Sequence, residues 1–126
     1  MKGKFCIILL LVALVASFAA CSNGAKEKYQ AQKEYVDSLQ KADKQYINDE
    51  YLNSITPLAV VVAQMKCYHK EVEALDSLRI LAKDAFGDNS AEYQEAYDEY
   101  VKVKDLYEQA SNAGLKELRD VKNAVR

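Results

Sequence analysis

The sequence predicts an all-α protein, an antiparallel three-helix bundle with coiled-coil-like packing. Residues that interrupt helices are scarce, with one proline and four glycines among 126 residues, while strong helix formers such as Ala, Lys, Glu, Leu and Gln are abundant. Two short clusters of turn and capping residues divide the chain, and apolar side chains between them recur every three or four residues. These observations predict helices near residues 26–53, 57–86 and 90–125.

The two interruptions combine capping side chains with residues that end or begin helices. The first, Asn-Ser-Ile-Thr-Pro at 53–57, places capping side chains directly before a proline suited to a first helical turn. In the second, at 86–90, Gly87 suits the left-handed C-terminal position, and Asn89 or Ser90 can cap the next helix. The alternative at Pro57 is a kink within one long helix.

The apolar pattern of each predicted helix indicates which side faces the core. The third helix carries a narrow coiled-coil seam, formed by Tyr93, Ala96, Tyr100, Val103, Tyr107, Ala110, Gly114, Leu118, Val121 and Val125. The first helix has a broader stripe that includes Tyr35, Val36, Leu39, Ala42, Tyr46 and Ile47. The middle helix is apolar around most of its circumference, so any part that its neighbours leave uncovered is a candidate contact surface for another chain.

The N-terminus has the order of a secretory signal peptide. Lys2 and Lys4 precede an apolar run over 5–16, and small residues lead to Cys21. The apolar stretch ends at residue 20 and is shorter than the roughly 20 residues that span a membrane. We therefore expect a cleaved signal, with an uncleaved membrane helix as the alternative.

The segment Phe18-Ala19-Ala20-Cys21 resembles the lipobox of bacterial lipoproteins, with Phe18 in place of the usual leucine. The resemblance implies cleavage before Cys21 and attachment of lipid to its sulfur, which anchors the chain. It divides the chain into a signal peptide (1–20), a lipidated tether (21–25) and the helical bundle (26–126). The resemblance also implies that Ser22, directly after the cysteine, favours the outer over the inner membrane, with the domain in the periplasm or at the cell surface.

Composition and motifs exclude several functions. Without Lys2 and Lys4 the chain has 15 basic and 19 acidic residues, which argues against nucleic acid as a partner. The one histidine, His69, lies two positions from Cys67, so on a helix the two side chains point about 200° apart and cannot share a metal ion. No catalytic, phosphate-binding or metal-binding motif is present, so we expect neither an enzyme nor a cofactor.

Three polar residues are expected at one level of the bundle. Folding the hairpins about the two turns places Asp43 level with Cys67, and His69 level with Tyr107. Asp43, His69 and Tyr107 are therefore candidates for a polar layer that fixes helix pairing; the alternative is a small ligand or proton-transfer site.

Cys67 and the nine tyrosines have a packing interpretation and a functional one. Cys67 is expected to act as a small apolar residue, or to bridge two copies of the chain in an oxidising envelope. Most tyrosines are expected to pack along the seams, whereas Tyr29, Tyr51 and Tyr97 lie nearer the edges and are candidates for an aromatic strip that binds glycan or peptide.

The expected function is that of an envelope lipoprotein, a non-enzymatic structural or protein-interaction module. It would be held to the membrane through Cys21 and associate with a protein partner or a second copy. The alternative is a small envelope binding protein or inhibitor that captures an enzyme, a glycan or a hydrophobic ligand.

Overall fold

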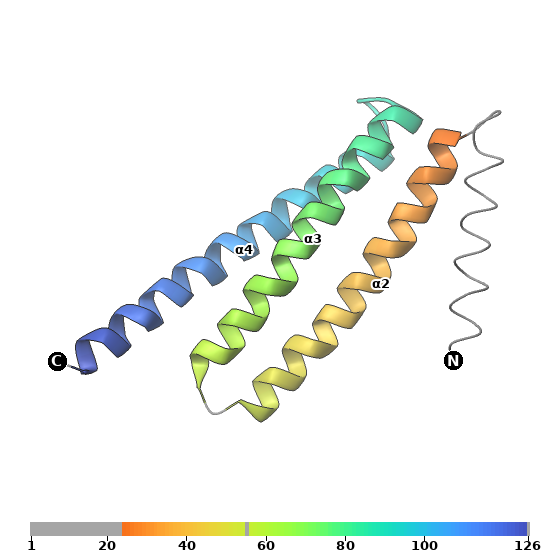
Figure 1. Cartoon of the computed structure of the whole chain (residues 1–126). Helices are drawn as coiled ribbons and strands as arrows, with labels where there is room; N and C mark the ends of the chain where they lie inside the picture. Colours follow the sequence, from red (N-terminus) through yellow and green to blue (C-terminus); the bar gives the residue numbers. More distant parts are fainter. Residues whose placement is uncertain (1–23, 55, 126) are drawn as a thin grey trace, which may run out of the picture.

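A computed structural model describes residues 24–54 and 56–125, and it contains the three expected helices (Figure 1). They are α2 (Gly24–Asn53), α3 (Pro57–Phe86) and α4 (Ala91–Ala124). The ends differ from the expected ranges by only one or two residues. The proposed signal peptide and Cys21 lie outside the described residues.

Both turns reverse the chain direction, so neighbouring helices are antiparallel (Figure 1). Pro57 begins α3 after Thr56, which is extended (φ −114°, ψ 139°), and it does not kink a continuous helix. Gly87 ends α3 with φ 91° and ψ 166°, so its φ is positive as expected but its ψ is extended rather than left-handed helical. Of the two expected caps, Ser90 is the one used, because its hydroxyl accepts a hydrogen bond from the backbone N–H of Tyr93 at 3.1 Å.

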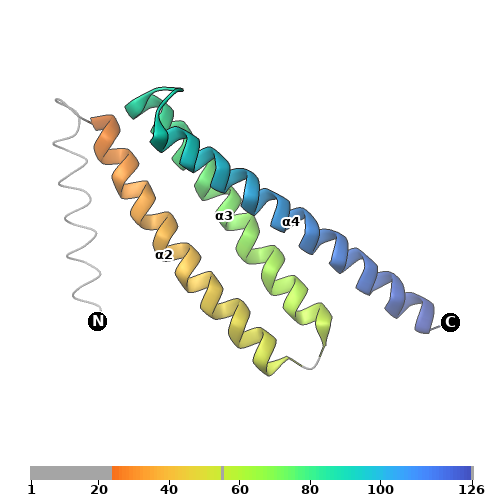
Figure 2. The same ribbon diagram turned by 180° about the vertical axis from the view of Figure 1, so that it is seen from behind.

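The middle helix holds the bundle together. α3 packs against both α2 and α4, whereas no Cα atom of α2 lies within 8 Å of a Cα atom of α4. Figures 1 and 2 show α4 turning away from the other two helices towards its C-terminal end. α2 and α4 still meet through side chains from the middle of α2 and the first third of α4, where the Gln40 amide donates to a Glu99 carboxylate oxygen at 3.1 Å. The bundle is therefore closed near the α3–α4 turn and open near the α2–α3 turn.

The core occupies the closed part. Leu75 is the most deeply buried large side chain, and Tyr29 packs edge-on against Phe86 with ring centroids 5.1 Å apart. The other members of this cluster are small or β-branched residues and one leucine: Val36, Ala74, Leu78, Ala82, Ala96 and Val103. Alanines on α3 and α4 let these two helices approach closely.

The seam of α4 is buried only in part, which corrects the expectation that it packs along its full length. Gly114 is buried against α3, so that an added Cβ would lie 3.3 Å from both Val61 and Met65. Beyond it Leu118, Val121 and Val125 are exposed. α3 begins at Pro57, only four residues before Val61, so α4 continues past the end of its partner helix.

Candidate functional site: a groove beside a buried carboxyl pair

The open end of the bundle contains a groove of about 690 Å³ between α2 and α3. α2 contributes Gln40, Lys41, Lys44, Gln45, Ile47, Asn48 and Tyr51; α3 contributes Val60, Gln64, Tyr68 and Glu71. The α3 residues follow spacings of four, four and three, so they lie along one face of the helix. The groove exists because α2 and α4 diverge here, and it is lined by mixed polar and aromatic side chains.

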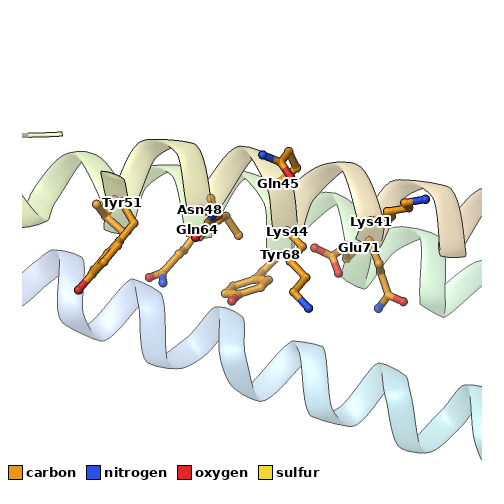
Figure 3. Close-up of a pocket in the computed structure, with 11 residues that line it drawn as sticks. Lys41, Lys44, Gln45, Asn48, Tyr51, Gln64, Tyr68 and Glu71 are labelled. Atoms are coloured by element: carbon orange, nitrogen blue, oxygen red, sulfur yellow. The ribbon is translucent and has the colours of Figure 1, made fainter. Parts of the chain in front are cut away.

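Figure 3 shows how these side chains are directed. Tyr51 and Lys44 from α2, and Gln64 and Tyr68 from α3, point into the space between this helix pair and α4. Gln45 points away, and its amide donates to Asp49 at 2.9 Å. The inward-facing groups are thus two phenol rings, one amide and one ammonium.

Two buried carboxyl groups meet beside the groove. Asp43 on α2 is 6% exposed and Glu71 on α3 is 5% exposed. Burial, and after it the hydrogen bonding and negative charge of Asp43, raise the pKa of Glu71 to about 7, while a hydrogen bond from Gln40 acts in the opposite direction. Oδ2 of Asp43 is buried without a hydrogen-bond partner. A proton on Glu71, which is retained below about pH 7, therefore lets the two carboxyl groups lie together in a site that water scarcely reaches.

Cys67 lies against the same pair, one helical turn before Glu71. Its side chain is buried, and burial together with the negative charge and hydrogen bonding of Asp43 raises the pKa of the thiol to about 11. A thiol with such a pKa remains protonated and is a poor nucleophile. Formation of a disulfide between two copies would require this part of the interface to open first.

The structure does not place Asp43, His69 and Tyr107 in one layer. His69 lies beside Tyr107 with ring centroids 5.7 Å apart, and its Nε2 is 3.3 Å from a carboxylate oxygen of Glu73 on an exposed surface. Asp43 instead lies against Cys67 and Glu71. Because His69 is two residues from each of these, it projects from the opposite side of α3. The expected layer is therefore corrected to two separate contacts on two faces of one helix.

The three tyrosines expected at the edges of the stripes have different surroundings. Tyr51 is 71% exposed and lines the groove. Tyr29 belongs to the core instead, and Tyr97 stacks on Tyr93 with a centroid separation of 6.1 Å. Only Tyr51 therefore combines exposure with a place in the groove.

The sequence reasoning missed Glu71 and Gln40. The signal for Glu71 was its spacing of four from Cys67, which puts it on the same face as a residue expected opposite Asp43. A glutamate in the middle of a helix sequence is usually exposed to solvent, so the pattern alone gave no reason to expect Glu71 to be buried. Gln40 could not be recognised from the sequence because its hydrogen-bond partner, Glu99, lies 59 positions away on another helix.

The chain matches no protein-family model, no curated protein and no solved structure. Within residues 24–54 and 56–125, no helix is long and apolar enough to cross a membrane. Over the same residues, no cluster of three or more His, Cys, Asp or Glu side chains is arranged to hold a metal ion.

Proposed function

We propose that this protein is a lipid-anchored lipoprotein of the bacterial envelope whose helices serve as a non-enzymatic interaction module. The observation that carries the proposal is the lipobox-like sequence ending at Cys21, only three residues before α2 begins at Gly24. A thioether-linked diacylglycerol at Cys21 adds about 0.8 kcal/mol of membrane affinity for each buried methylene. Such a short tether keeps the first turn of α2 close to the lipid surface.

The course of the helices supports an interaction role. The start of α2 and the C-terminal end of α4 lie at opposite ends of the bundle (Figure 1), so an anchor at Cys21 would direct the exposed end of α4 away from the membrane. This end carries Leu115, Leu118, Val121 and Val125 on the surface. Contiguous exposed apolar side chains often mark a site of contact with another protein.

The anchor is tested by labelling cells that express the full chain with a palmitate analogue and then separating membranes. The native chain should take up label and sediment with membranes, and Cys21→Ala should abolish the labelling. Cys67→Ala is the matched control, because it removes the other cysteine of the mature chain and should keep the label. Label retained by Cys21→Ala would contradict the proposal.

The interaction role is tested by photocrosslinking in intact cells from a probe placed at Leu115. We expect discrete adducts that are lost from the Leu118→Lys/Val121→Lys variant, because charge on an apolar contact surface opposes docking. Val101→Lys is the control, since Val101 is an exposed apolar residue of α4 outside this end. Adducts that are unaffected by the double substitution would argue against the end of α4 as the contact surface.

A further inference from the structure

We propose that the groove between α2 and α3 is a binding site for a short acidic oligosaccharide. This proposal goes beyond the anchored interaction module and does not depend on lipidation of Cys21. It rests on the size of the groove, the kinds of groups directed into it, and the sign of its charge.

The size of the groove fits a small ligand rather than a protein surface. Its volume of about 690 Å³ lies within the range of about 300–1,000 Å³ typical of small-molecule sites. The lining comes from α2 and α3 alone, two helices that pack closely along their length. The groove is therefore built on one pair of packed helices, while the divergence of α2 and α4 leaves an entrance.

The side chains that point into the groove match the chemistry of a sugar. The rings of Tyr51 and Tyr68 point into the groove (Figure 3) and offer flat faces for the apolar C–H faces of pyranose rings. Gln64, directed the same way, carries an amide that can both donate to and accept from hydroxyl groups, and Asn48 adds a second amide to the lining. A purely hydrophobic ligand would leave these polar groups without partners, at a cost in binding.

The charge of the groove favours an anionic sugar. Lys41 and Lys44 both line it, and the ammonium of Lys44 points inward. The single carboxyl group of the lining is Glu71, which is buried and holds its proton more tightly than an ordinary glutamate. The exposed charged groups of the lining are therefore both cationic, although the chain as a whole is acidic, with a formal net charge of −2. A carboxylate-bearing sugar would form a charge-assisted hydrogen bond with Lys44.

The test is calorimetric titration of the full chain, purified in detergent, with trigalacturonic acid and with neutral maltotriose as the uncharged comparison. We expect saturable binding of trigalacturonic acid, about ten-fold tighter than that of maltotriose and weakened by added salt. Tyr51→Ala and Lys44→Gln should each weaken binding of the acidic sugar by about ten-fold, because each removes one directed contact. Both side chains are exposed, so the variants should fold.

Matched controls come from α2 itself. Tyr46→Ala and Lys28→Gln remove an exposed tyrosine and an exposed lysine that do not line the groove, and both should bind like the native chain. The absence of saturable binding by either sugar would overturn the proposal, as would equal weakening in the controls. Equal affinity for the two sugars, unaffected by Lys44→Gln, would overturn the assignment of an acidic ligand.

Discussion

Glu71 of α3 lies against Asp43 of α2 as a pair of carboxyl groups inside the helix interface, and both residues are at least nine-tenths buried. Two negative charges in such a place would repel each other strongly, so a proton on one of the two groups stabilises the pair. The groups that face Glu71 are Asp43 and Gln40 from α2 and Glu99 from α4, and none of them is a cation. Packing of α2 on α3 is consequently linked to the protonation of Glu71.

The pKa of Glu71 predicts a bundle that loses stability as pH rises. Its pKa is about 7 in the folded chain against an ordinary value of 4.5, so the folded state binds the proton more tightly than the unfolded state. The contribution is full below pH 4.5 and is lost as pH rises to about 7, with a total of about 3 kcal/mol. Urea unfolding followed by circular dichroism between pH 4.5 and 8 measures this slope.

Glu71→Gln separates this effect from the other titrations. The variant should match the native chain near pH 5 and should be more stable at pH 8, because its neutral amide can donate to Asp43 at any pH. Glu73→Gln serves as the control, since Glu73 lies on the exposed side of α3 next to His69. An unchanged pH slope in Glu71→Gln would show that the buried pair does not control stability.

Cys67 should react slowly with thiol reagents. Its buried thiol has a pKa of about 11, so very little thiolate is present at pH 8. Mass spectrometry of the peptide that contains Cys67, after treatment with iodoacetamide, should find little adduct in the folded chain and rapid reaction in urea. Rapid modification of the folded chain would mean that the α2–α3 interface opens readily around Asp43.

Leu75 should be the most costly core position to truncate. Its side chain is 1% exposed, and Leu75→Ala removes buried methyl groups and leaves a cavity. The expected loss is about 2–5 kcal/mol in the free energy of unfolding. Leu115→Ala is the matched control because Leu115 is 61% exposed, and it should change stability by less than about 0.5 kcal/mol. Similar losses at both positions would contradict the observed core.

Ser90 should contribute to stability as the N-cap of α4, whereas Asn89 should not. Ser90→Ala removes the acceptor for the backbone N–H of Tyr93 and should cost about 0.5–2 kcal/mol. Asn89→Ala changes an exposed neighbour and should be nearly neutral. Thermal unfolding of both variants compares the two losses in stability. A larger loss for Asn89→Ala would show that Asn89, and not Ser90, is the N-cap.

The helices could be predicted from sequence because the signals that set them are local. Pro57, Gly87 and Ser90 act on the residues directly next to them, and so they located all the helix boundaries adjoining the two turns to within one residue. The antiparallel order also followed from the two short turns. The seam of α4 was correct as far as Gly114, where α3 is present to cover it.

The site could not be predicted because it depends on how far the helices diverge. Periodicity indicates where Tyr51 and Tyr68 lie around the circumference of their helices, but it does not show whether α4 covers them. Which face of α3 lies against Asp43 depends on the rotation of α3 about its axis. This rotation determines whether Asp43 meets Glu71 or His69. His69 and Glu71 point about 200° apart around α3, so both cannot face Asp43, and the expected polar layer was divided in two.

The position of α3 between α2 and α4 also has a consequence for how the chain folds. Each pair of packed helices is joined by a short turn, so the backbone contacts form between segments that are neighbours in sequence. Chains with such local contacts fold on microsecond to millisecond timescales, since little loop entropy is lost before packing begins. The two helix pairs can thus form soon after the chain is synthesised, without waiting for distant segments to meet.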